Sequence, residues 1–167
     1  TGSELKNTFC ITNKNYAFLS HHIGDMENYE TLQSFEQGVE HFEKLFRVSP
    51  VAIACDLHPN YLATRYAVER AQHENLPTFN IQHHHAHIAS VMAEHDLHQP
   101  LIGVALDGTG YGTDGTVWGA EVFAGDLTGF QRMSHLRYAP LPGGDLAVRQ
   151  PWRAALGYAS LSPEARR

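Results

Sequence analysis

The sequence predicts an α/β protein whose mixed sheet is flanked by helices. Short apolar runs bounded by turn residues alternate with longer stretches in which apolar residues recur every three or four positions, as in strands followed by helices. Polar turns join neighbouring apolar runs near both ends of the chain, which indicates antiparallel hairpins. The 167 residues suit a single domain and can bury a substantial core.

The elements follow one another in a regular order. A hairpin is expected over residues 7–12 and 16–20, with Asn13-Lys14-Asn15 as its turn. The sheet is expected to include the strands on both sides of the histidine-rich helix. We expect a helix over 27–46, a strand over 51–55, a helix over 60–74, a strand over 79–82, a helix from the histidines to about His95, a strand over 101–106, two antiparallel strands over 115–124 and 129–138, and a helix over 148–159.

Helical spacing identifies the side chains that we expect in the core. The long first helix repeats apolar residues on one face, and the histidine-rich helix carries a shorter apolar face. The expected core residues of these two helices are Leu32, Phe35, Val39, Phe42 and Leu45, followed by Ile88, Val91 and Met92.

Composition excludes several function classes. Hydrophobic content of 43% and charged content of 18% are ordinary for a globular protein, and the net charge of −6 argues against a nucleic-acid-binding surface. No apolar run approaches the roughly 20 residues that span a bilayer, and no stretch has the pattern of a signal peptide. Cys10 and Cys55 lie in apolar runs, so we interpret them as buried free thiols, which fits a reducing cytoplasm.

The most informative stretch of the sequence runs over residues 78–115. A helix that starts in the histidine cluster places His83 and His87 on one face, and a neighbouring apolar strand ends on Asp107. Two imidazoles and a carboxylate are ligands for a divalent metal such as iron, zinc or manganese. The alternative is a pair of surface histidines, which the spacing by itself does not exclude.

His84 and His85 point away from the expected metal-binding face of the helix. We assign them, with Asp107, as candidate catalytic residues that contact substrate or support the metal ligands. Solvent exposure is the alternative for both histidines.

The glycine-rich stretch after Asp107 is a candidate phosphate site. DGTGYGTDG matches neither the dinucleotide fingerprint nor the Walker A pattern, but it resembles the Asp-Gly-Thr-Gly hairpin of actin-like and sugar-kinase-like folds. By that resemblance, Gly108, Thr109 and Gly110 hold phosphate from a turn. A plain glycine-rich hairpin, with Asp114 as a turn former, is the alternative.

Three further residues are candidates for ligand contacts. His58 lies between a strand and a helix, a place where α/β proteins position ligands, although it is equally suited to starting the helix. Arg149 and Arg153 flank Pro151-Trp152 and have the forked shape that fits phosphate and carboxylate. Solvated helix charges are the alternative for both arginines.

Taken together, the motifs resemble the HypF family of hydrogenase-maturation carbamoyltransferases. The matching segments lie between about Glu4 and Ala159 and are ELKNTFC, FLSHHIGDMEN, DLHPNYLATRYA, QHHHAHIASVMAEH, GVALDGTGYGTDGTVWGAE and PLPGGDLAVRQPWRAA.

This resemblance implies a fold and a reaction. The fold is a ribonuclease-H-like lobe of the actin, sugar-kinase and Hsp70 superfamily. Carbamoyl phosphate and ATP, the latter with Mg²⁺, are converted to a carbamoyl adenylate, and the carbamoyl group then passes to the C-terminal cysteine of HypE. His83 and His87 match the family's metal-binding pair, for iron or zinc, and Asp107 matches its strand-end acid.

The resemblance also sets expectations about extent. Residues 1–167 are expected to form the first lobe of a longer protein, inactive without the second lobe and prone to self-association through an uncovered apolar surface. Two other functions stay open: a sugar or acetate kinase of the same superfamily, and a metal-binding module without catalysis. A retained metal would favour the carbamoyltransferase over the kinase. Nucleotide binding in the presence of metal would favour it over the metal-binding module.

Overall fold

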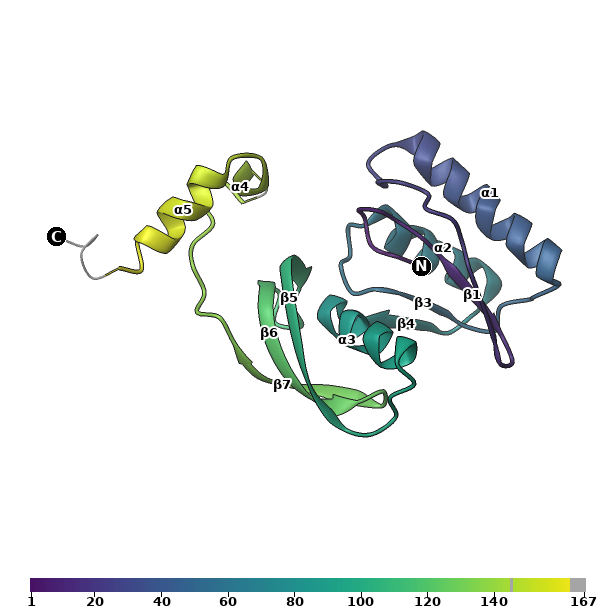
Figure 1. Ribbon diagram of the computed structural model, residues 1–167. Helices are drawn as coiled ribbons and strands as arrows, with labels where there is room; N and C mark the ends of the chain where they lie inside the picture. The colour runs from purple at the N-terminus through teal and green to yellow at the C-terminus, as the bar shows by residue number, and fades with distance from the viewer. Residues whose placement is uncertain (145, 163–167) are drawn as a thin grey trace. The chain divides into compact units, whose positions relative to one another are not determined.

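The computed structural model describes residues 1–144 and 146–162, and the chain divides into two compact units between Ser134 and His135 (Figure 1). The described residues form β1 (Cys10–Asn13), β2 (Tyr16–Leu19), α1 (Tyr29–Phe46), β3 (Ile53–Asp56), α2 (Leu62–Glu74), β4 (Thr78–Ile81), α3 (His83–Glu94), β5 (Leu101–Tyr111), β6 (Val117–Asp126), β7 (Gly129–His135), α4 (Leu146–Arg149) and α5 (Pro151–Ala159). The predicted α/β class and the order of strands and helices are confirmed.

The sheet arrangement differs from the predicted single mixed sheet. The described strands form three separate sheets, an antiparallel β1–β2 pair, a parallel β3–β4 pair and a three-stranded sheet in the order β5-β6-β7. The expectation that β4 and β5 share a sheet is therefore wrong. The physical reason is that α3, which connects these two strands, packs against β5 and shares its apolar side chains with the β5–β6 sheet.

The first core lies between the N-terminal hairpin region and helices α1 and α2. Helix α1 begins at Asn28, whose side chain accepts a hydrogen bond from the Thr31 N–H, and it ends at Arg47 in the left-handed conformation. Leu45 is 59% exposed, so its predicted burial is wrong, because the face centred on Phe35 and Val39 does not extend to the last turn. The buried members of this core are Phe9, Ile11, Met26, Phe35, Val39 and Ala63.

The second core lies between α3 and the β5–β6 sheet. Ile88 and Met92, one turn apart on α3, are buried against Ala105, Trp118 and Phe123. A Cβ atom on Gly103 would lie 2.5 Å from Ile88 Cδ1, so the helix can approach the strand this closely only because residue 103 is glycine. Val91 lies at the edge of the apolar face and is 51% exposed, so its predicted inward position is wrong.

Strand β5 is longer than predicted and carries an irregularity where the strand was expected to end. Leu106 pairs with Ala120 and Gly110 pairs with Trp118, so four steps along β5 span only two steps along β6. The chain therefore bulges at residues 107–109 and reverses direction only after Tyr111. The predicted turn over Gly108–Gly110 is wrong, since these residues are part of the strand.

The true reversal is the Gly112–Thr116 loop, which Asp114 organises. The Asp114 carboxylate accepts hydrogen bonds from the Thr116 N–H, the Thr116 hydroxyl and Trp118 Nε1–H. The Thr116 hydroxyl and the other donors lower the pKa of Asp114 to about 2. The alternative reading of Asp114 as a turn former is thus confirmed.

Three smaller predictions have mixed outcomes. The helix expected over 148–159 is divided into α4 and α5 at Gln150, and Pro151 opens the second helix. Both cysteines are free, but only Cys55 is buried, and Cys10 is exposed on β1. Among the described helices, none is both long and apolar enough to cross a membrane.

Candidate metal centre

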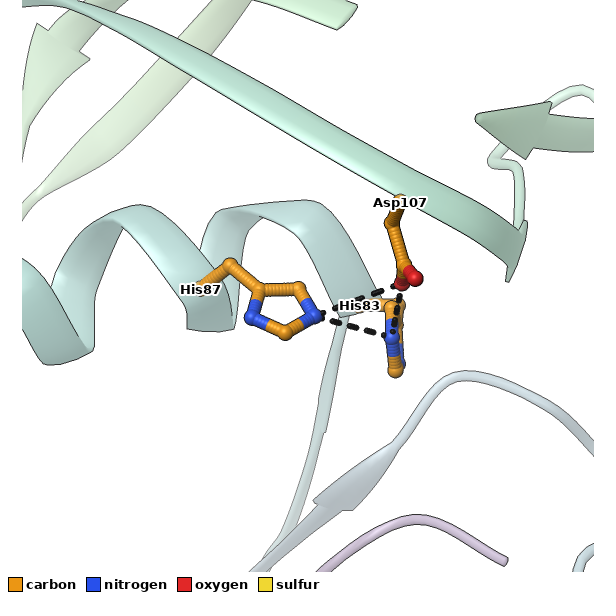
Figure 2. Close-up of side chains that lie close together, drawn as sticks. All are labelled: His83, His87 and Asp107. Atoms are coloured by element: carbon orange, nitrogen blue, oxygen red, sulfur yellow. Dashed lines mark hydrogen bonds and ion pairs between the residues drawn. The ribbon is translucent and has the colours of Figure 1, made fainter. Parts of the chain in front are cut away.

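The first turn and a half of α3 brings two histidines together, as the HxxxH spacing predicts. Gln82 starts the helix, and its side-chain oxygen accepts the N–H of His85. His83 and His87 then lie on the same face, and their Nε2 atoms are 3.1 Å apart (Figure 2).

Asp107 reaches the same point from the bulge of β5. Its Oδ2 atom lies 2.8 Å from His83 Nε2 and 3.3 Å from His87 Nε2. Its other oxygen accepts the N–H of Gly108 at 2.6 Å, which fixes the orientation of the carboxylate. Figure 2 shows the three side chains converging from the helix and the strand above it.

The three converging atoms are suited to hold a cation. One nitrogen from each histidine and one oxygen from Asp107 lie within 4.8 Å of one another. Neutral imidazole nitrogens and a carboxylate oxygen all present lone pairs, so their close approach requires a proton or a metal ion between them. Two imidazoles and one carboxylate form a mixed nitrogen and oxygen set that suits zinc or iron.

The electrostatics of the centre agree with this geometry. The hydrogen bond to Asp56 raises the pKa of His83, and this effect outweighs burial, which lowers it. The charge of Asp107 also raises the pKa of His83. Burial pushes the pKa of Asp107 upward, but the Gly108 N–H and His83 outweigh it, so the pKa of Asp107 lies below its ordinary value. The carboxylate is therefore ionised and ready to bind a cation.

Asp56 is a component of the site that the sequence analysis missed as a functional residue. It is buried at the end of β3, and its Oδ2 atom lies 3.0 Å from His83 Nδ1. Its other oxygen accepts the N–H of His58 at 2.8 Å. The sequence carried one signal for it, since Asp56 ends an apolar strand in front of a helix, as candidate ligands often do in α/β proteins.

His84 and His85, which we predicted as catalytic residues, face the protein interior. His84 is fully buried, with Nδ1 3.1 Å from Gln82 Nε2, and burial lowers its pKa, with the neighbouring His83 adding to the effect. Its Nε2 atom has no hydrogen-bond partner among the described residues. Burial also lowers the pKa of His85, whose ring packs against Phe123. Both side chains lie behind the helix face that carries His83 and His87, and the alternative of solvent exposure is wrong for His84.

The candidate phosphate residues lie next to the metal ligands. Gly108 and Thr109 are exposed on the bulge beside Asp107, and a Cβ atom on Gly108 would meet nothing within 4 Å. Gly110 is buried, and a Cβ atom there would lie 2.5 Å from His84 Cε1. Gly108 and Thr109 are thus open to a ligand, whereas Gly110 is required for packing.

His58 is connected to the centre through the Asp56 loop. Its ring stacks on Tyr61, with 4.0 Å between ring centroids, and meets the ring of Tyr111 edge to face at 5.0 Å. The structure therefore places this predicted ligand-binding residue in the loop after β3, with its ring against Tyr111 at the end of β5.

Arg149 and Arg153 belong to the second unit and are described within it. Arg149 is exposed at the end of α4. Arg153 donates from Nε to Gln150 Oε1 at 2.6 Å, and its guanidinium carbon lies 4.6 Å from the centre of the Trp152 ring.

A groove of about 1270 Å³ in the first unit reaches the metal-binding face of α3. Cys55, Asp56, His83, His87 and Ser90 are among the residues that line it. The groove is large enough for a small molecule, and its presence was not predictable from the sequence.

The fold and the site together define a class: an α/β protein with a histidine pair on a helix and an aspartate on the adjacent strand, in an arrangement that could hold a metal ion. Comparison with protein families makes the assignment specific. Residues 1–94 match the HypF Kae1-like domain, and residues 103–165 match the second subdomain of the carbamoyltransferase Kae1-like domain. The chain belongs to the HypF family and corresponds to part of its C-terminal region.

Named relatives agree with this assignment. The chain is 46% identical to carbamoyltransferase HypF2 of Cupriavidus necator over 92% of its own length and 19% of that protein. It is 44% identical to carbamoyltransferase HypF of Rhizobium leguminosarum bv. viciae over 99% of its length and 21% of that protein. The chain therefore spans about a fifth of the length of these relatives.

Solved structures share the fold. A crystal structure of full-length HypF in the phosphate- and nucleotide-bound form is 52% identical, with a TM-score of 0.89 over 95% of this chain and 20% of that one. HypF of T. kodakarensis is 42% identical, with a TM-score of 0.90 over 96% of this chain and 21% of that one.

Proposed function

We propose that this chain is the metal- and phosphate-binding part of an ATP-dependent carbamoyltransferase that acts in [NiFe]-hydrogenase maturation. The observation that carries the proposal is the convergence of His83, His87 and Asp107 beside the exposed Gly108–Thr109 bulge. Membership of the HypF family, whose relatives are named carbamoyltransferases, supplies the reaction class.

The proposed reaction uses carbamoyl phosphate and ATP with Mg²⁺. They are converted to a carbamoyl adenylate, and the carbamoyl group then passes to the C-terminal cysteine of HypE. A full-length relative has been solved in a phosphate- and nucleotide-bound form, which supports phosphate chemistry in this family. In this proposal the chain is part of an actin-like two-lobed fold and acts in the cytoplasm.

The residues have separate tasks in this proposal. His83, His87 and Asp107 hold the transition metal, which supplies Lewis-acid stabilisation of negative charge when bound. The backbone N–H groups of Gly108 and Thr109 bind phosphate from the bulge, because glycine lets a ligand approach the backbone closely. His58 contacts the ligand from the opposite loop, and Arg149 and Arg153 hold an anionic group.

The same proposal predicts that the isolated chain is inactive. It spans about a fifth of its HypF relatives, and in this proposal residues beyond that fifth help to position ATP. Positioning of the reactants lowers the activation barrier by roughly 7–11 kcal/mol. We expect no measurable carbamoyl phosphate-dependent exchange between ATP and pyrophosphate from residues 1–167 alone.

The decisive experiment measures this exchange in the full-length protein that contains these residues. Asp107→Ala should lower the exchange rate by about two to three orders of magnitude, since it removes both a metal ligand and a fixed charge. Asp96→Ala is the matched control, because Asp96 pairs with His98 on the surface and should leave the rate unchanged. Normal exchange in Asp107→Ala, with a normal thermal unfolding transition, would show that the acid is structural.

Calorimetric titration with ATP separates the proposal from a metal-binding module without catalysis. The full-length protein should bind ATP and carbamoyl phosphate, and Gly108→Ala should weaken binding because a Cβ atom obstructs the approach of phosphate to the bulge. A protein that binds metal but no nucleotide would favour the simple metal-binding function.

A further inference from the structure

Asp56 lies behind the metal-binding face rather than on it, and it uses both carboxylate oxygens. Oδ1 accepts the backbone N–H of His58 at 2.8 Å, and Oδ2 lies 3.0 Å from His83 Nδ1. The carbonyl oxygen of the same residue accepts the hydroxyl of Thr64 in α2 at 3.2 Å. The side chain is only 8% exposed. Asp56 is therefore held in one orientation by groups on three sides.

The surroundings of His83 favour one position for its proton. A carboxylate faces each ring nitrogen and can only accept, with Asp56 Oδ2 3.0 Å from Nδ1 and Asp107 Oδ2 2.8 Å from Nε2. Asp56 is the more buried acid, since 8% of its side chain is exposed against 31% for Asp107, so water competes less for its hydrogen bond and the single proton of the neutral ring is placed on Nδ1. The lone pair then lies on Nε2, which faces Asp107 and lies 3.1 Å from His87 Nε2. His83 is thus a candidate ligand whose other ring nitrogen, Nδ1, has a carboxylate partner in Asp56. The same hydrogen bond fixes the rotation of the ring.

We propose that Asp56 is a positioning residue that locks His83 in the Nδ1–H tautomer and so presents Nε2 to a divalent metal. The inference rests on the proposed metal centre but concerns a residue outside the ligand set. Carboxylate partners of ligating histidines fix the tautomer and the ring orientation, and their removal weakens metal binding about 10–100-fold.

A merely structural role for Asp56 makes a different prediction. If Asp56 served only to hold the 56–58 loop, an asparagine that accepts the His58 N–H through its oxygen would replace it fully. That orientation, however, turns the asparagine NH₂ group toward His83. The ring must then accept at Nδ1 and carry its proton on Nε2, where it blocks the metal. Asparagine thus keeps the loop but reverses the tautomer.

The test compares Asp56→Asn with the parent chain, using the metal-free protein at a pH where His83 is neutral. Nitrogen-15 chemical shifts of the imidazole report the tautomer, and calorimetric titration with Zn²⁺ reports the affinity. We expect the proton of His83 to move from Nδ1 to Nε2 and the zinc affinity to fall at least 10-fold. Asp96→Asn, which alters the exposed Asp96–His98 pair, should change neither value.

Two outcomes would overturn the proposal. One is an Asp56→Asn protein that folds, keeps Nδ1–H on His83 and binds zinc within twofold of the parent. The other needs no variant: a parent chain whose neutral His83 carries its proton on Nε2 contradicts the assignment, even if Asp56→Asn fails to fold. A parent that shows the Nδ1–H tautomer but binds no zinc refutes the proposed metal function instead and leaves the tautomer assignment standing.

Discussion

At the scale of single residues, His83 is the centre of the site. It is the one metal-ligand candidate with an acid on each side, Asp56 at Nδ1 and Asp107 at Nε2. The neighbouring His84 has the opposite environment, since it is fully buried and lies close to the positive charge that His83 can carry. The pKa values of these adjacent histidines are therefore shifted in opposite directions, because one faces two carboxylates and the other faces the core.

This contrast predicts opposite titrations in the metal-free chain. His83 should titrate above the ordinary histidine pKa of 6.5, and His84 should titrate below it. Because the folded-state pKa of His83 is raised, its contribution to stability is fully present below about pH 6.5 and is lost as the pH rises through the folded value. Nitrogen-15 NMR titration measures both residues. A His83 midpoint at or below 6.5 would contradict the assignment.

At the scale of elements, the site depends on how closely α3 approaches β5. Glycines at 103 and 110 leave room for Ile88 and His84, and the bulge between Leu106 and Gly110 turns Asp107 toward the helix. The helix supplies the histidines, and the strand irregularity supplies the aspartate. The centre is thus a product of the α3–β5 contact.

Alanine substitution at two glycines of β5 tests this contact. In Gly110→Ala the new Cβ atom would lie 2.5 Å from buried His84, so we expect the free energy of unfolding to fall by about 1–3 kcal/mol and zinc binding to weaken. In the matched control Gly108→Ala, the Cβ atom meets nothing within 4 Å, and stability should change by less than about 0.5 kcal/mol. Urea denaturation measures the free energy of unfolding of both variants. Equal values would show that Gly110 and His84 are not in close contact.

The face of α3 predicts a second difference in stability. Ile88→Ala should lower the free energy of unfolding by about 2–5 kcal/mol, because Ile88 is buried against Gly103 and the second core. Val91→Ala should lower it by less than about 1 kcal/mol, since Val91 is 51% exposed. Thermal or urea unfolding measures both variants. A larger loss of unfolding free energy in Val91→Ala than in Ile88→Ala would show that the other face of the helix is the buried one.

The sequence was a good guide to elements and to which side chains converge at the candidate metal centre, and a poor one to how strands combine. Periodicity located α1 and α3, and the HxxxH spacing identified His83 and His87, because helix geometry is local. The extension of β5 past Asp107 was missed, since glycine and threonine there look like a turn although pairing with β6 keeps them extended. Asp56 was missed because its role depends on a contact 27 residues away, which no local pattern encodes.

At the scale of the whole molecule, the sheet β5-β6-β7 has one face covered by α3 and one apolar face that is open in the first unit. Ile102, Val104 and Leu106 are 76%, 60% and 79% exposed. In the β5–β6 register they lie opposite Ala124, Val122 and Ala120, so the open face is apolar on both strands.

The resemblance to a known family was confirmed, but the division into three sheets and two units could not be predicted from the sequence, because it depends on long-range packing.

The open face predicts that the chain self-associates when it is produced alone. Burial of apolar surface contributes roughly 25 cal/mol per Å², so three exposed aliphatic side chains on one strand favour association. Sedimentation velocity at increasing concentration should show oligomers, and Val104→Lys should reduce them. Lys substitution of exposed Val51, outside this face, is the control. A parent chain that stays strictly monomeric would contradict the prediction.

The zinc content of the chain after equilibrium dialysis, measured by elemental analysis, tests the proposed metal centre most directly. We expect one bound zinc ion per parent chain, because His83, His87 and Asp107 form a single group of potential ligands. We expect no bound zinc in the double variant His83→Ala/His87→Ala and unchanged zinc in His98→Ala, whose histidine lies outside this group. Equal zinc content in the double variant and the parent would contradict the proposed metal centre.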